Sequence, residues 1–149
     1  MNNVSSFKSD FSVQDFTSKH QVVFYNYWQK ICGDRTMPSR ADIHPEDIVE
    51  ILPHIMIFEK KENDFIVRLM GTECAENLGE GTGNNLTSLE DGTETFKRFN
   101  WCFENRKPYF HIKPLDKLKK DHVTLSTIVM PLSDNDNDVR MVILICDFY

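Results

Sequence analysis

The segment 139–148, near the end of the chain, is apolar on both of its alternating faces. One face carries Val139, Met141, Ile143 and Ile145, and the other carries Val142, Leu144, Cys146 and Phe148. Successive side chains of a strand point to opposite sides of the sheet, so both sides of this strand need cover. The pattern predicts a strand at the centre of a sheet whose two faces are both covered.

Periodicity elsewhere predicts four further strands and three helices. We expect the strands at 55–59, 65–70, 109–113 and 122–132, and the helices at 12–32, 73–78 and 91–106. This order is typical of an α+β domain with a five-stranded antiparallel sheet and the two later helices on one face. The N-terminal helix is left to cover the other face, and we assign to it the side of Val142 and Leu144.

Length and charge limit the class of protein. The 149 residues, 40% of them apolar, suffice for one domain, which we place at 12–149 after a flexible tail at 1–11. The net charge of -6 repels nucleic acid and anionic lipid. No run approaches the roughly 20 apolar residues of a membrane span, and the N-terminus lacks a signal-peptide pattern. We therefore expect a cytoplasmic protein that binds neither nucleic acid nor membrane.

The four cysteines stand apart in the sequence, each in or beside an apolar segment, and no C-x-x-C pair occurs. Such cysteines are typical of buried thiols that a cytoplasmic compartment keeps reduced. A redox switch is the alternative reading.

Signatures of catalysis and metal binding are missing from the sequence. There is no G-x-S-x-G elbow, and the five histidines have no H-x-x-x-H or H-E-x-x-H spacing. We therefore assign no catalytic residues and no metal ligands. A small α+β enzyme that uses His111, His122 or Asp147 beside an internal cavity remains the alternative function.

A cavity is expected between the sheet and the two later helices. We expect it to be mainly apolar and to be lined by Phe58, Leu69, Leu78, Phe99 and Ile128. A ligand for such a cavity would be small, largely apolar, and uncharged or weakly polar.

The predicted N-terminal helix carries a broad apolar surface. Phe16, Val23, Phe24 and Trp28 cover more than about 100° of it, which exceeds the need of one sheet face. Trp101 lies about 140° around the helix at 91–106 from Phe96, away from that helix's apolar stripe. We interpret these five residues as interface candidates for a homodimer or a partner protein, with cover by a loop as the alternative for Trp101.

The connector after the first helix carries several residues with a structural role. Pro38 and Pro45 fix the backbone angle φ, which restricts the course of the loop. We expect a guanidinium of Arg35 or Arg40 to tie the loop to nearby carbonyls or carboxylates, because this group offers five donors in one plane.

Motifs in this connector and beyond it resemble those of a stand-alone bacterial PAS-like family. They are Tyr27-Trp28, G-D-R-T-M-P-S-R-A-D-I at 33–43, P-E-D-I at 45–48, L-P-H at 52–54, R-L-M-G-T at 68–72, L-G-E-G-T-G-N at 78–84, R-K-P at 106–108 and M-P-L-S-D at 130–134. The resemblance implies a PAS fold with strand order 2-1-5-4-3, a bacterial cytoplasmic origin and a sensing or signalling role. The sequence departs from the family's pattern in its last hairpin, where asparagine and aspartate replace a typical glycine.

The resemblance also bears on cofactors and output. The helix at 91–106 contains no histidine for haem, so His111 just beyond it is the only candidate ligand. Glu104 to Lys107 does not match the flavin-binding motif G-x-N-C-R-F-L-Q. Haem, flavin and metal are therefore disfavoured, and any cofactor is unknown. No kinase, cyclase or DNA-binding segment follows the last strand, so we expect output through an unknown signalling protein.

Overall fold

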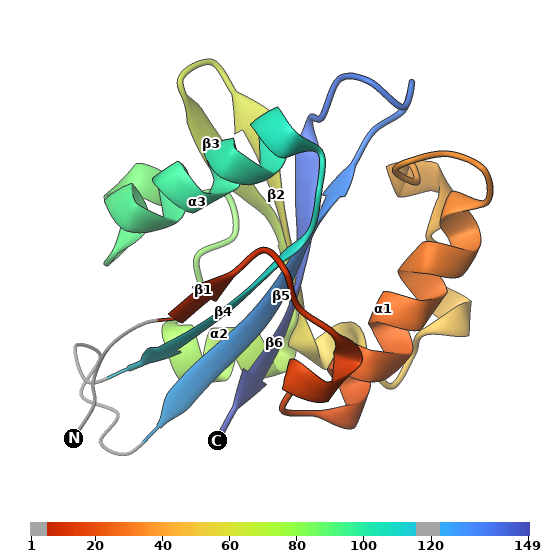
Figure 1. The fold of residues 1–149 in the computed structure, drawn as a ribbon. Coiled ribbons are helices and arrows are strands. Elements are labelled where there is room, and N and C mark those ends of the chain that lie inside the picture. Colours follow the sequence, from red (N-terminus) through yellow and green to blue (C-terminus); the bar gives the residue numbers. More distant parts are fainter. Residues whose placement is uncertain (1–5, 116–122) are drawn as a thin grey trace.

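The computed structural model describes residues 6–115 and 123–149 (Figure 1). The described residues form six antiparallel strands in the order β1-β4-β5-β6-β2-β3: β1 (Ser6–Lys8), β2 (Ile55–Lys61), β3 (Asp64–Met70), β4 (Tyr109–Pro114), β5 (Thr124–Leu132) and β6 (Met141–Phe148). The α-helices are α1 (Lys19–Cys32), α2 (Thr72–Leu78) and α3 (Gly92–Asn105). The chain is an α+β domain whose five predicted strands follow the predicted order, with β1 as a sixth strand beside β4.

The strand β6 lies inside the sheet, between β5 and β2, and residues 142–146 are all buried. Helix α1 lies on one face of the sheet, whereas α2 and α3 lie on the other (Figure 1). The two-sided apolar pattern of this segment thus predicted its central place and its double cover.

The predicted assignment of the two β6 faces is wrong. Ile143 and Ile145 share a core with Phe24 and Trp28 of α1, whereas Val142, Leu144, Cys146 and Phe148 belong to the core on the side of α2 and α3. Because both faces of the strand are apolar, the pattern shows that both must be covered. It does not indicate which helix packs on which face.

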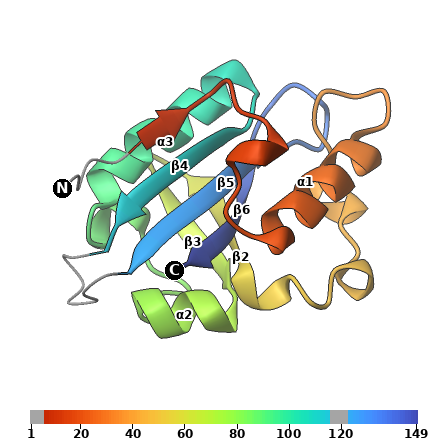
Figure 2. The same cartoon turned by 60° about the horizontal axis from the view of Figure 1, so that its bottom comes forward.

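The N-terminal region differs from the predicted helix at 12–32. Ser12 and Asp15 form the capping box that their spacing suggests, but it caps a single 3-10 turn, η1 (Val13–Asp15). The helix α1 begins only at Lys19, because Ser18 is a second N-cap and its hydroxyl accepts a hydrogen bond from the Gln21 N–H at 3.3 Å. Residues 6–8 of the expected tail are the edge strand β1, red in Figure 2, while residues 1–5 of that tail lie outside the described residues. Residues 116–122 lie outside them too.

The β5–β6 hairpin closes without a glycine because Asp136 adopts a positive φ of 61°. Its side-chain Oδ1 accepts hydrogen bonds from the backbone N–H groups of Thr36 at 2.9 Å and Met37 at 3.0 Å. The hairpin thereby holds the connector that follows α1.

Arg35 fastens this connector to the end of α1. Its Nη2 donates to the Ile31 carbonyl at 2.8 Å, its Nε donates to the Cys32 carbonyl at 3.2 Å, and its guanidinium pairs with Asp42 at 2.9 Å. Within residues 6–115 and 123–149, the Arg40 side chain makes no hydrogen bond or ion pair. The two prolines act through the backbone: the Pro38 carbonyl accepts from the Ser133 N–H at 2.9 Å, and Pro45 begins the 3-10 turn η3 (Pro45–Asp47).

Replacing Arg35 by alanine removes hydrogen bonds that cap the end of α1, together with an ion pair that contributes little because it is partly exposed. We therefore expect the free energy of unfolding to fall by about 1 kcal/mol. Urea unfolding followed by circular dichroism measures the change. Arg40→Ala is the matched control and should leave the midpoint unchanged. Equal losses in both variants would contradict a specific role for Arg35.

Candidate functional site

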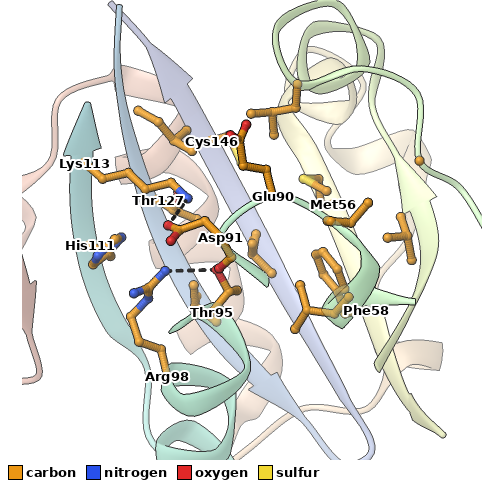
Figure 3. Close-up of a pocket in the computed structure, with 18 of the residues that line it drawn as sticks. Met56, Phe58, Glu90, Asp91, Thr95, Arg98, His111, Lys113, Thr127 and Cys146 are labelled. Carbon is orange, nitrogen blue, oxygen red and sulfur yellow. Dashed lines mark hydrogen bonds and ion pairs between the residues drawn. The ribbon is translucent and has the colours of Figure 1, made fainter. Parts of the chain in front are cut away.

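A cavity of about 510 Å³ lies between the sheet and the helices α2 and α3 (Figure 3). Its volume falls within the range of roughly 300 to 1,000 Å³ that is usual for small-molecule sites. Met56, Phe58, Val67, Phe99 and Leu144 form much of its apolar wall. The protein therefore contains a cavity that is large enough for a small-molecule ligand.

Aromatic packing fixes α3 over the sheet beside this chamber. The ring centroid of Phe99 lies 5.0 Å from that of Phe58 on β2 and 5.2 Å from that of Phe65 on β3, both in edge-to-face geometry. The side chains that line the cavity from β5 and β6 include the short Thr127, Val129 and Cys146. The aromatic rings therefore hold α3 over the sheet, and the short side chains of β5 and β6 leave space beneath this helix.

The lining of the cavity is mainly apolar, as we expected, but one of its walls is polar. Lys113 of β4 pairs with Asp91 at 3.0 Å, and the Arg98 guanidinium of α3 donates to the Thr95 hydroxyl at 3.0 Å (Figure 3). His111 lies between Lys113 and Arg98 in this view and also lines the cavity. The site thus combines an apolar wall with a charged one.

His111 is only 6% exposed. Burial lowers the pKa of its imidazole to about 3, and the cations Arg98 and Lys113 act in the same direction. The ring is therefore neutral at pH 7.

This pKa has a consequence for stability. Because the pKa of His111 is lower in the folded protein than in the unfolded chain, the unfolded state binds more protons and stability falls as the pH falls below about 6.5. We expect His111 to account for a loss of about 1.5 kcal/mol between pH 6.5 and pH 5. Urea unfolding across this range should show a smaller loss in His111→Gln, and equal pH dependence in both proteins would contradict the prediction.

All four cysteines are free and buried, as predicted. Cys146 lines the cavity. A hydrogen bond with the Cys146 thiol and burial both raise the pKa of the neighbouring Cys74 thiol. Because the thiolate is the reactive form, Cys74 is a poor nucleophile.

Three of the five predicted cavity residues, Phe58, Leu78 and Phe99, line the cavity. The expectation for Leu69 and Ile128 is corrected, because both belong to the core beneath α1. Ile128 lies opposite Ile145, and Leu69 lies opposite Ile57, and cross-strand partners share a face of the sheet. The mistaken assignment of the sheet faces explains both errors.

The polar wall was not predicted, although the sequence holds a signal for it. Tyr109, His111 and Lys113 alternate along β4 and therefore share one face. On α3, Thr95, Arg98 and Phe99 are spaced at i, i+3 and i+4, which places them on one stripe. Reading both patterns together would have placed two cations and a histidine beside Phe99.

The interface candidates are mostly packed within their own chain. Phe24 is fully buried, and Trp28 is 5% exposed with its Nε1–H donating to the Pro131 carbonyl at 3.2 Å, so both are corrected to core residues. The ring of Phe16 packs on Phe110, and that of Trp101 packs on Phe7, each at 5.3 Å between centroids. Only Val23 of the five is exposed, so α1 offers little apolar surface for a homodimer.

Residues 6–115 and 123–149 hold neither a metal-binding cluster nor a membrane-spanning helix. No cluster of three or more histidine, cysteine, aspartate or glutamate side chains there is arranged to hold a metal ion. None of the helices in this part of the chain has the length and apolar character needed to cross a membrane.

Comparison with known protein families adds one match. Residues 16–144 match a family model described as a PAS domain. No curated protein and no solved structure matches the chain. The matched region contains α1, α2 and α3 and nearly all the residues that line the cavity. The chain therefore belongs to the PAS domain family, which consists in general of sensory and signalling modules.

Proposed function

We propose that this protein is a non-enzymatic, cytoplasmic sensor that binds a small ligand in the cavity and signals through a protein partner. The observation that carries the proposal is the chamber of about 510 Å³ beneath α3, which has an apolar wall and convergent polar groups. Membership of the PAS domain family supports the sensory part of the proposal.

Hydrogen bonds supply a route by which ligand binding reaches the other face of the sheet. Leu144 lines the cavity, while its neighbours Ile143 and Ile145 on β6 pack beneath α1. The fully buried Gln21 of α1 donates through Nε2 to the Ile145 carbonyl at 3.3 Å and to the Ser126 carbonyl at 3.2 Å. A shift of β5 or β6 upon binding would therefore move the start of α1.

The alternative of a small enzyme has less support. His111 lines the cavity, but its imidazole makes no hydrogen bond to a carboxylate within the described residues, so it lacks the partner that orients a general base. Asp147 accepts a hydrogen bond from the Thr17 hydroxyl on the α1 side of the sheet. His122 lies outside the described residues.

Hydrogen exchange measured by mass spectrometry tests this proposal. Protein as purified is compared with protein that has been unfolded in urea, dialysed free of small molecules and refolded. We expect faster exchange after this treatment in β5, in β6 and in the first turn of α1. In Gln21→Met the change should persist in β6 and disappear from α1, whereas identical exchange before and after dialysis in the wild type would contradict the proposal.

A further inference from the structure

Arg98 lines the cavity without a counter-ion in the part of the chain that the structure describes. Its side chain is half-buried, its guanidinium donates to the Thr95 hydroxyl, and no carboxylate of residues 6–115 and 123–149 forms an ion pair with it. The Tyr109 hydroxyl also interacts with this guanidinium. Because a guanidinium has five N–H donors, several of them remain for another partner. Because a partly desolvated cation is stabilised by an opposite charge, Arg98 favours an anionic group in the cavity.

His111 gives an independent indication of a ligand at the same place. Its side chain is more than nine-tenths buried and lines the cavity, and within the described residues its imidazole makes no hydrogen bond. Buried polar groups in proteins almost always have a partner. A neutral imidazole offers one N–H donor, so a ligand oxygen between Arg98 and Lys113 would satisfy it.

Within residues 6–115 and 123–149, the other charges of the lining favour a ligand with a single negative charge. The carboxylate of Asp91 already pairs with Lys113 at 3.0 Å, and Glu80 and Glu90 line the cavity as exposed residues. A second negative charge, as in a dicarboxylate or a nucleotide, would meet these carboxylates, because the described part of the lining holds no lysine or arginine other than Arg98 and Lys113.

The opposite wall is apolar and takes the rest of the ligand. Met56, Phe58, Val67 and Leu144 face the chamber from β2, β3 and β6. We propose that the cavity binds a monocarboxylic acid with an apolar body, its carboxylate held by Arg98, His111 and Lys113. This inference rests on the proposed ligand-binding function and names the class of ligand.

Isothermal titration calorimetry at pH 7 with octanoate and octanamide tests the inference, because the two probes share their chain and differ in charge. We expect octanoate to bind at least about tenfold more tightly than octanamide. Arg98→Met should weaken octanoate at least about tenfold and leave octanamide unchanged. Its matched control is Lys97→Met, the adjacent residue on α3, which is exposed and pairs with Glu94 outside the cavity.

A second measurement uses only the wild-type protein, so its result does not depend on whether a variant folds. Nitrogen NMR of labelled histidine should show that octanoate raises the pKa of His111 and that octanamide does not, because only octanoate brings a negative charge. Equal affinity for the two probes, or no binding of octanoate below about 1 mM, would overturn the carboxylate assignment. Equal affinity for the two probes would not contradict the proposed sensory function. If octanoate binds but hydrogen exchange in α1 does not change, the carboxylate assignment holds and the proposed sensory function is refuted.

Discussion

The Phe24→Ala variant is expected to unfold with a free energy about 3 to 5 kcal/mol lower than that of the wild type. Phe24 is fully buried in the core between α1 and the sheet, where Ile143 and Ile145 of β6 also lie. Removing its ring leaves a cavity at the contact that covers one whole face of β6. Since domains of this size are stable by only about 5 to 15 kcal/mol, the variant should lose a large share of its stability.

Val23→Ala is the control for this variant, because Val23 is the adjacent residue of the same helix and is 45% exposed. Its unfolding free energy should change by no more than about 0.5 kcal/mol. Urea unfolding of both proteins, followed by tryptophan fluorescence, measures the difference. A loss below about 1 kcal/mol in Phe24→Ala would mean that α1 is not an integral part of the fold.

A second large effect is expected from Gly92→Ala. A Cβ atom at Gly92, the first residue of α3, would lie 2.0 Å from the Leu86 carbonyl oxygen and 2.9 Å from the carbonyl carbon. Backbone atoms cannot yield as a side chain does, so α3 or η5 (Leu86–Ser88) must shift. We expect a loss of about 3 kcal/mol in the free energy of unfolding.

Gly81→Ala is the matched control for Gly92→Ala. Its added Cβ would meet only side-chain atoms, of Leu89 at 3.8 Å and Asn84 at 3.9 Å, which is ordinary contact. Thermal unfolding should find this variant close to the wild type. If both glycine variants melt alike, the close approach of α3 to η5 is not a constraint on the fold.

The sequence predicted the architecture well because its strongest signals are local. Alternation along β6, for example, required that both faces of this strand be covered. It did not predict where α1 begins, because Ser12 and Ser18 are both good N-caps and packing decides between them. Nor did it reveal β1, a short polar segment whose pairing with β4 depends on the finished sheet.

The site was less predictable than the fold, for a physical reason. Whether Leu144 or Ile145 faces the cavity depends on which helix packs on which side, and this is a long-range choice that period-two patterns do not encode. The same ambiguity placed Ile128 on the wrong side of the sheet. Lys113 and Asp91 are far apart in the sequence, so their ion pair is visible only once α3 lies over β4.

The central claim, that the cavity holds a small molecule, is tested most directly by native mass spectrometry of the protein purified from the organism that encodes it. We expect a one-to-one adduct that is released under denaturing conditions. It should be absent from Val129→Trp, whose larger side chain would fill the cavity from β5. Circular dichroism must first establish that this variant is folded. Identical spectra, without any adduct, for the wild type and Val129→Trp would contradict the claim.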